Sequence, residues 1–251
     1  MDLQLDGKTV LVTGSSKGIG AGIAMKFALE GAIVLVHGRD RAQADEIAHA
    51  IVRQGGRAHV VLGDLLDDAA VARLLDSARQ QAGPIDILVN NAANDDRHQL
   101  QDVTPAYWDE RIAVNLRHQY FCAQAVAPAM RASGSGVILN LGSISWHLAQ
   151  ANLSIYMTAK AGIEGLTHGL ARDLGADGIR VNCIIPGAVR TPRQERLWHT
   201  PEAEAVILQG QCLQTRVEPE DVAALALFLA SDNAAKCTGR EYFVDAGWYG
   251  A

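Results

Sequence analysis

The fold is decided by the stretch Thr9-Val10-Leu11-Val12-Thr13-Gly14-Ser15-Ser16-Lys17-Gly18-Ile19-Gly20. Its first residues are apolar and β-rich, and the residues from Ile19 to Leu29 have a helical pattern, so a buried strand, a glycine-rich turn and a helix are expected in succession. Glycines in such a turn let the backbone approach a pyrophosphate, and the helix N-terminus offers free N–H groups. The spacing is Gly-x-x-x-Gly-x-Gly, so it is the preceding strand that makes it indicate a nucleotide site.

Strand and helix patterns alternate along the rest of the chain. Seven short apolar runs with helical patterns between them predict an α/β protein with a single-domain Rossmann fold, whose doubly wound, seven-stranded parallel sheet has helices on both faces and is buried on both. The ligand of such a sheet lies beyond the carboxyl ends of the strands, where the strand order switches. The predicted strands cover residues 10–13, 33–37, 58–62, 85–90, 137–141, 180–185 and 241–244.

Length and composition agree with one domain over residues 1–251, with a hydrophobic fraction of 49%. No apolar run reaches the roughly 18 residues of a membrane span, and the N-terminus lacks the basic and apolar regions of a signal peptide, so a cytoplasmic protein is expected. A net charge of −6 disfavours nucleic acid as a partner. The four cysteines are scattered without a Cys-x-x-Cys spacing, so no metal is expected.

Tyr156 and Lys160 form the second feature with chemical meaning. They are one helical turn apart, so a helix would place the ammonium beside the phenol. A nearby positive charge favours phenolate and would lower a pKa that starts near 10, which would let the tyrosine exchange a proton near neutral pH. The same spacing occurs on ordinary amphipathic helices, and it is the glycine-rich turn upstream that favours acid–base chemistry.

Taken in order, these motifs resemble the short-chain dehydrogenase/reductase family along essentially the whole chain. Further matches are Asn90-Asn91-Ala92-Ala93 after the fourth strand and Pro186-Gly187 before Thr191. Ala93 departs from the glycine that the family usually has, which affects only the shape of that turn. The resemblance implies a nicotinamide cofactor and a catalytic set of four residues, which are Asn115, Ser143, Tyr156 and Lys160.

The resemblance also implies a role for each of these four. Tyr156 would take the proton from a substrate hydroxyl, and Lys160 would lower the pKa of Tyr156 and hold the nicotinamide ribose. Ser143 would hydrogen-bond the same substrate oxygen as carbonyl character develops. Asn115 would anchor a water molecule through its backbone carbonyl and complete a proton path to Lys160.

Charge at the end of the second strand favours NADP over NAD. Members of the family that use NAD have an acidic residue there, whereas this chain has Gly38 followed by Arg39, with Lys17 in the glycine loop. Two cations and no carboxylate suit a 2′-phosphate, although both could be merely solvated charges and NAD stays possible. The residues expected at the cofactor are Gly14, Ser16, Lys17, Gly18, Ile19, Gly20, Arg39, Asp64, Leu65, Asn91, Tyr156, Lys160, Pro186, Gly187, Val189 and Thr191.

Three segments at the substrate end are rich in hydrogen-bonding groups and indole rings. Such a site suits a polyhydroxylated substrate, because unpaired polar groups in a closed pocket are costly, whereas a steroid or acyl pocket would have more aliphatic residues. Each side chain could equally have an ordinary structural role. The residues expected at the substrate are Asn94, Asp95, Ser143, Ser145, His147, Tyr156, Arg193 and Trp198.

At finer grain, residues 141–148, 156–165, 190–201 and 236–242 are similar to bacterial aldose 1-dehydrogenases of the pentose type. The implied reaction oxidises the anomeric C1 hydroxyl of a free aldose to the aldonolactone, with L-arabinose favoured and D-galactose or D-xylose as alternatives. Other possibilities are a 3-oxoacyl carrier-protein reductase or another short-chain alcohol or ketone reductase, a sugar-phosphate substrate, and a non-catalytic NADP-binding sensor.

Two further expectations concern mobility and assembly. Residues of about 187–218 follow a strand end and are interrupted by prolines, which predicts a substrate lid. The apolar and aromatic C-terminal residues 244–251 would bury well against another subunit, so a homotetramer is expected.

Overall fold

The computed structural model describes residues 2–198 and 200–250. Met1 and Ala251 of the predicted domain and His199 of the predicted lid lie outside the described residues.

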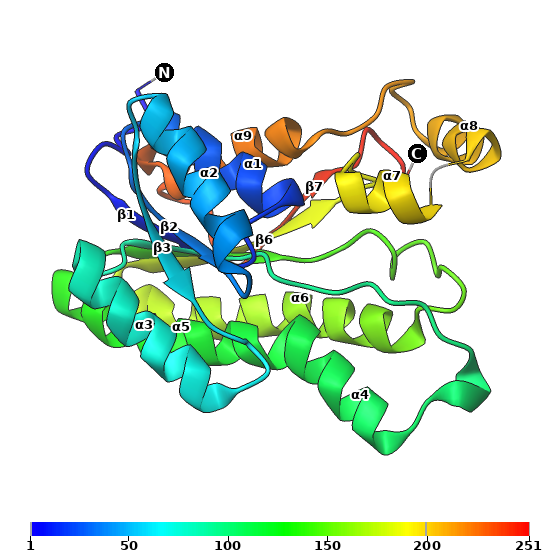
Figure 1. Ribbon diagram of the computed structural model, residues 1–251, viewed down its shortest axis with the longest axis horizontal. Helices are drawn as coiled ribbons and strands as arrows, with labels where there is room; N and C mark the ends of the chain where they lie inside the picture. The colour runs from blue at the N-terminus through cyan, green and yellow to red at the C-terminus, as the bar shows by residue number, and fades with distance from the viewer. Residues whose placement is uncertain (1, 199, 251) are drawn as a thin grey trace.

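The seven predicted strands form one parallel sheet, in the order β3-β2-β1-β4-β5-β6-β7 (Figure 1). The order reverses between β1 and β4, which is the switch point where a doubly wound sheet binds its ligand. The predicted Rossmann arrangement is therefore confirmed. The strands are β1 (Thr9–Val12), β2 (Ile33–Gly38), β3 (Arg57–Leu62), β4 (Ile87–Asn90), β5 (Gly136–Leu141), β6 (Ile179–Pro186) and β7 (Glu241–Val244).

Helices cover both faces of the sheet (Figure 1). Each face has its own cluster of buried apolar residues, packed beneath three helices. On one face these are α1 (Gly18–Leu29), α2 (Arg41–Arg53) and α9 (Pro219–Ala230); on the other they are α3 (Asp68–Ala82), α5 (His118–Ser133) and α6 (Ser154–Leu174).

Local sequence explains where several helices begin. Asp40 accepts a hydrogen bond from the backbone N–H of Gln43 and so caps α2, and Asp67 caps α3 in the same way. The first residue of α9 is Pro219, whose missing N–H is not needed at that position, and a capping box precedes it.

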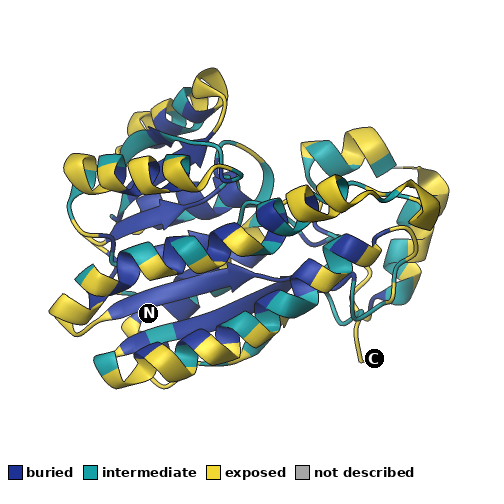
Figure 2. Ribbon diagram, turned by 90° about the horizontal axis from the view of Figure 1, so that it is seen from below, coloured by how far each residue is buried: buried dark blue, intermediate teal, exposed yellow. Residues whose placement is uncertain are grey.

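The burial of the strands differs between the centre and the edges of the sheet. All side chains of β1, β4 and β5 are buried, and Figure 2 shows the sheet as a buried layer between helices with exposed outer faces. At the edges, β3 and β7 are only partly buried, and Phe243 of β7 is 38% exposed. The expectation that every strand is buried on both faces was wrong for these two, because an edge strand has a neighbour on one side only.

Beyond the carboxyl ends of the strands, two short helices project from the body of the molecule (Figure 1). These are α7 (Pro192–Trp198) and α8 (Pro201–Gly210), both within the predicted lid. The chain end returns to the same region, because the Asp245 carboxylate accepts hydrogen bonds from the N–H groups of Gly247 and Tyr249. The remaining helices are α4 (Pro105–Ile112), the π-helical η2 (Ala113–Arg117) and the 3₁₀ turns η1 (Leu100–Asp102), η3 (Gly175–Asp177) and η4 (Asp232–Ala234). None of the helices formed by the described residues is both long and apolar enough to traverse a lipid bilayer.

Candidate active site

The glycine loop between β1 and α1 is packed too closely for side chains. Gly14 has a φ of +65°, and a Cβ there would lie 2.9 Å from Cα of Ala92. A Cβ on Gly20 would lie 2.5 Å from Nδ2 of Asn91, which donates hydrogen bonds to the carbonyls of Thr13 and Gly14. The loop therefore exposes backbone rather than side chains, and Lys17 leaves the start of α1 uncapped by its side chain. These residues fit a dinucleotide pyrophosphate at the helix N-terminus.

The ends of β2 and β3 lie beside this loop. A Cβ on Gly38 would approach Cβ and Oγ of Ser16 to 3.0 Å, so the backbone is close-packed where an acidic side chain would otherwise stand. Arg39 is exposed, and its Nη1 lies 3.6 Å from a carboxylate oxygen of Asp64. Lys17 is also exposed. Two exposed cations thus lie at the predicted adenosine end, and one of them, Arg39, is close to a carboxylate.

Helix α6 presents Tyr156 and Lys160 to the carboxyl ends of β4 and β5. Lys160 is 1% exposed, its ammonium donates a hydrogen bond of 2.7 Å to the carbonyl of Leu141, and Nζ is 5.5 Å from the Tyr156 ring centroid. Ser143 follows β5, and its hydroxyl is hydrogen-bonded to the hydroxyl and the N–H of Ser145. The helix and the strand end thus bring three of the four predicted catalytic residues to one place.

The pKa of Tyr156 shifts in the opposite direction from the one expected. Burial of the phenol raises its pKa, the negative charge of Asp95 raises it further, and a hydrogen bond with Ser143 opposes both effects. Burial also lowers the pKa of Lys160 to about 8. The expectation that the pKa of Tyr156 lies below its ordinary value was wrong for the protein without cofactor. Burial disfavours the phenolate, and this effect outweighs any stabilisation from the Lys160 ammonium, which is itself disfavoured by burial.

Asn115 lies in η2, the π-helical turn between α4 and α5. Its side chain is buried and holds Asn94 by two hydrogen bonds, one accepted from the Asn94 N–H at 2.8 Å and one donated to the Asn94 carbonyl at 3.0 Å. A π turn is often found at functional sites. The side chain of Asn115 therefore fixes the loop after β4, and the water-anchoring role of its backbone carbonyl stays a prediction.

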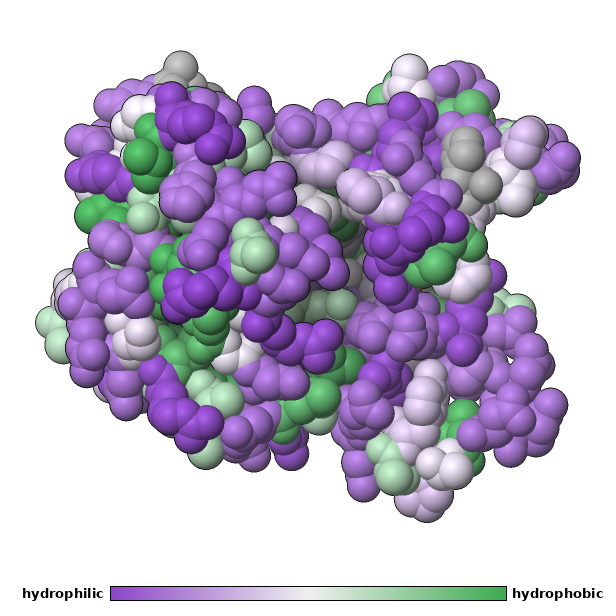
Figure 3. All heavy atoms as spheres, viewed as in Figure 1, coloured by the Kyte–Doolittle hydropathy of each residue, from purple (hydrophilic) through white to green (hydrophobic). Residues whose placement is uncertain are grey.

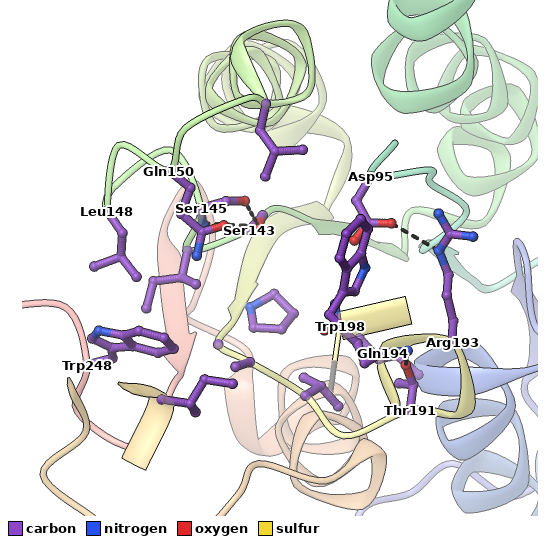
Figure 4. A pocket seen from close by; sticks show the side chains of 18 of the residues that line it. Asp95, Ser143, Ser145, Leu148, Gln150, Thr191, Arg193, Gln194, Trp198 and Trp248 are labelled. Atoms are coloured by element: carbon purple, nitrogen blue, oxygen red, sulfur yellow. Dashed lines mark hydrogen bonds and ion pairs between the residues drawn. The ribbon is translucent and has the colours of Figure 1, made fainter. Parts of the chain in front are cut away.

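A cavity of about 780 Å³ lies between the strand ends and the segment of α7 and α8. The face drawn in Figure 3 is mostly hydrophilic and is hollowed beside this segment. Figure 4 shows Ser143 and Ser145 on one side of the cavity and Asp95 and Arg193 on another. The predicted residues that line it are Ile19, Asn91, Asp95, Ser143, Ser145, Tyr156, Lys160, Pro186, Gly187, Val189, Thr191, Arg193 and Trp198.

The other predicted cofactor residues lie outside this cavity, in the glycine loop and at the ends of β2 and β3. They are Gly14, Ser16, Lys17, Gly18, Gly20, Arg39, Asp64 and Leu65. Asn115 does not line the cavity and is hydrogen-bonded to Asn94, which lies between the lining residues Asn91 and Asp95 in sequence. The structure thus divides the predicted cofactor set between a cavity for the reacting end and an open surface for the adenosine end.

Two predicted substrate residues do not line the cavity. The ring of His147 shares a 3.0 Å hydrogen bond with Glu164 and packs against Trp146 and Tyr249. Asn94 is hydrogen-bonded to Asp96, Arg193 and Asn115. The structure therefore does not bring these two residues to the cavity with the other six predicted substrate residues.

Helix α7 is tied across the cavity mouth to the loop after β4. Arg193 donates hydrogen bonds to Asp95 at 3.0 Å and to Asp96 at 2.9 Å. Five residues after Arg193, the indole of Trp198 lies against the guanidinium of Arg97, which is 4.2 Å from the ring centroid. Two charged contacts therefore hold this part of the predicted lid in the observed position.

Sequence reasoning missed several lining residues, of which Trp248 is the most informative. It follows β7 by four residues and reaches the cavity only because Asp245 bends the chain end. Figure 4 shows its indole across the cavity from Trp198. The apolar C-terminal residues were interpreted as a subunit contact, and no local pattern distinguishes a residue that packs against another subunit from one that lines the cavity. Other lining residues that were missed include Gln150, Gln194, Glu202, Glu204 and Arg216.

A dinucleotide cradle at the switch point, with a tyrosine, a lysine and a serine converging on the adjoining cavity, is the architecture of a nicotinamide-dependent oxidoreductase. The family model described as enoyl-(acyl carrier protein) reductase matches residues 14–249. The chain belongs to the short-chain dehydrogenase/reductase family and is a dehydrogenase of that family.

Individual relatives agree with this assignment. A D-xylose 1-dehydrogenase of Caulobacter vibrioides is 54% identical over 97% of this chain and 96% of its own length. A "Probable galactose dehydrogenase" of Rhizobium meliloti is 44% identical over 95% of this chain and 93% of its own. Among solved structures, a 7α-hydroxysteroid dehydrogenase in complex with NADH and a 7-oxo bile acid conjugate has a TM-score of 0.94 at 34% identity, covering 98% of this chain and 96% of that one.

Proposed function

We propose that this dehydrogenase oxidises the anomeric C1 hydroxyl of a free aldose to the aldonolactone, with NADP as the hydride acceptor. The observation that carries the proposal is the convergence of Ser143, Tyr156 and Lys160 on a cavity with polar groups such as Asp95 and Gln150. The printed names of two relatives, a D-xylose 1-dehydrogenase and a galactose dehydrogenase, support the same reaction class.

Each residue has a defined share in the reaction. Tyr156 removes the proton of the C1 hydroxyl, and Ser143 donates a hydrogen bond to the same oxygen as it becomes a carbonyl. When bound, a nicotinamide would supply the acceptor for the hydrogen on C1, which leaves as a hydride. Lys160 carries positive charge beside the phenol and holds the ribose, and Asn115 completes the proton path to Lys160. Because burial raises the pKa of Tyr156, oxidation is expected to become faster as the pH rises above neutrality.

A neutral sugar suits the charges of the cavity better than a sugar phosphate. The cations among its described lining residues are Arg97, Lys160, Arg193 and Arg216, and its carboxylates are Asp95, Glu195, Glu202 and Glu204. Arg193 is paired with Asp95 and Asp96, and Arg216 is bonded to Glu204 and to the carbonyl of Ala188. A dianionic phosphate bound at Arg193 or Arg216 would have to displace these carboxylates, which a neutral sugar need not do.

Among aldoses we place L-arabinose first, with D-galactose and D-xylose next. The test is reduction of NADP and of NAD by the purified protein with each of these sugars, with D-glucose, and with the phosphates of the pentoses. Turnover with a free pentose or with D-galactose supports the proposal, and lactone as the product establishes attack at C1. Turnover with acetoacetyl-CoA alone would replace it by a carrier-protein reductase, and no turnover with cofactor still bound would favour a sensor.

NADP is proposed because of the charges at the predicted adenosine end. Gly38 leaves no carboxylate to repel a 2′-phosphate, and Arg39 and Lys17 are exposed cations that could reach one. Arg39 lies 3.6 Å from Asp64, a separation that permits exchange to a phosphate. The ratio of kcat/KM for NADP and NAD in the sugar assay tests this directly.

We further propose that residues 187–218 act as a lid over the cavity and that the protein is a cytoplasmic homotetramer. The contacts of Arg193 and Trp198 support the lid, since they join it to the loop after β4 at the mouth of the cavity. The exposed rings of Phe243 and Tyr249 on and after the edge strand β7 support a subunit contact. Light scattering coupled to gel filtration measures the assembly, and a monomer would refute it.

A further inference from the structure

His37, the penultimate residue of β2, is a buried titratable side chain that the proposed reaction does not use. It is 2% exposed and lies directly beneath the glycine loop. The N–H of Gly14, the first glycine of that loop, points at Nδ1 of His37 at 2.9 Å. On the other side of the ring, Nε2 lies 3.1 Å from the carbonyl oxygen of Gly63, just after β3. One imidazole therefore joins three chain segments.

The partners determine the protonation of this ring. A backbone N–H can only donate, so Nδ1 of His37 must be the acceptor for Gly14. A carbonyl can only accept, so Nε2 must carry the proton that is donated to Gly63. The imidazole is thus neutral with a fixed tautomer, and burial supports this by lowering its pKa to about 4.

The three segments that His37 joins are those expected to hold the adenosine and pyrophosphate of the cofactor. The backbone of His37 reinforces the link, because its carbonyl accepts from the N–H of Ser15 and its N–H donates to Oγ of Ser15, each at 2.9 Å. Gly63 leads directly into Asp64, which stands near Arg39. No cofactor atom needs to touch His37 for it to set the spacing between these loops.

We infer that His37 is a positioning residue for the cofactor: its neutral imidazole holds the glycine loop and the end of β3 at the separation that the adenosine diphosphate part of NADP or NAD requires. The Gly14 bond is the more important of the two, since it orients the loop whose N–H groups face the pyrophosphate. The proposal rests on the hydrogen bonds of a fixed tautomer and not on the sugar that is oxidised.

Three substitutions separate the two hydrogen bonds. In His37→Asn, Oδ1 can replace Nδ1 as acceptor for Gly14, but the side chain is too short for Gly63. In His37→Gln, an amide N–H can reach Gly63, but no acceptor remains at the δ position. His37→Leu keeps apolar volume and loses both bonds. A matched control is Val34→Ala, a fully buried change on the same strand that destabilises the protein without touching either loop.

The measurement is the dissociation constant of NADPH, NADH and ADP for each variant, by fluorescence titration and calorimetry, alongside the melting temperature. We expect His37→Leu and His37→Gln, which both lose the hydrogen bond to Gly14, to weaken all three ligands about tenfold. His37→Asn keeps that bond and should stay within about threefold of the parent. ADP should respond as the full cofactors do, because it contains the part that these loops hold. The kcat at saturating cofactor should be unchanged.

Two results would overturn the inference. One is parent-like affinity in His37→Gln or His37→Leu. The other is an affinity loss in Val34→Ala as large as in the His37 variants at equal loss of stability, which would reduce His37 to a stability residue. If His37→Leu does not fold, the order of His37→Asn and His37→Gln decides the question, and equal or reversed affinities count against the proposal.

Discussion

The two ends of the active site are built in different ways. At the adenosine end, the glycine loop, β1 and the start of α1 come from one continuous stretch, residues 9–20, and their contacts are mostly backbone. At the substrate end, the lining residues come from segments that follow β4, β5, β6 and β7, and their contacts are side chains. The comparison teaches that one short stretch of sequence can form the glycine loop, whereas the cavity forms only when several distant segments meet.

The largest effect is expected where the two ends join, at Tyr156. In Tyr156→Phe the proton acceptor is lost while the ring still fills its place, so turnover should fall by a factor of about 10³ or more. The dissociation constant of the cofactor should change by less than about threefold, because phenylalanine removes only the hydroxyl. Steady-state assays with a cofactor titration measure both. A variant that retains more than a tenth of the parent turnover would mean that Tyr156 is not the acid–base group.

A second test acts on the adenosine end alone. Arg39→Ala should raise the KM for NADP about tenfold or more and leave the KM for NAD nearly unchanged, since a charge-assisted bond to the 2′-phosphate is lost. Arg41→Ala is the matched control, because Arg41 is also exposed and pairs with Asp45 on the next turn. Equal responses of the two cofactors to Arg39→Ala would remove the argument for NADP.

A third test acts on the substrate end alone. Trp248→Ala should raise the KM for the sugar about tenfold with a smaller change in kcat and none in cofactor affinity, because an indole wall of the cavity is lost. Trp248→Phe should restore much of the loss. Tyr249→Ala is the control, since Tyr249 packs on His147 and Phe243. If Trp248→Ala changes the affinity for cofactor instead, substrate binding and cofactor binding do not depend on separate parts of the site.

The smallest effect concerns pH and stability. Burial lowers the pKa of His37 to about 4 and that of His118 to about 3, both below the ordinary value of 6.5. Below pH 6.5 the unfolded chain binds protons that the folded protein refuses, so stability is full above that pH and falls as the pH drops towards 4. Between pH 6.5 and 4.5 each histidine should lower the free energy of unfolding by up to about 3 kcal/mol, at about 1.4 kcal/mol per pH unit. Denaturant unfolding from pH 7 to 4.5 should show a shallower decline in His37→Asn, and an identical slope would exclude His37 as a contributor.

The same contrast governs what could be predicted from the sequence. All seven strands were predicted because each is a short, largely apolar run between helical patterns, including the partly buried edge strands. Tyr156 with Lys160 was predicted because a helix fixes their separation. Trp248 was missed because its position depends on the turn at Asp245. His147 was expected at the cavity and does not line it, and nothing in its neighbourhood along the chain indicates its hydrogen bond with Glu164. The pKa of Tyr156 was expected to be lowered and is raised instead, because the burial that raises it is a property of the whole fold.

By itself the sequence determined the sheet, the glycine loop and the placement of Tyr156 and Lys160 one helical turn apart, since each depends on residues close together in the chain and on fixed strand and helix periods. Only the tertiary structure decided which side chains line the substrate cavity, how Arg193 joins α7 to Asp95 and Asp96, and that His37 links three loops. The physical reason is that these contacts bring together segments that are remote in sequence, and their energies depend on burial and on partners that exist only once the chain has folded.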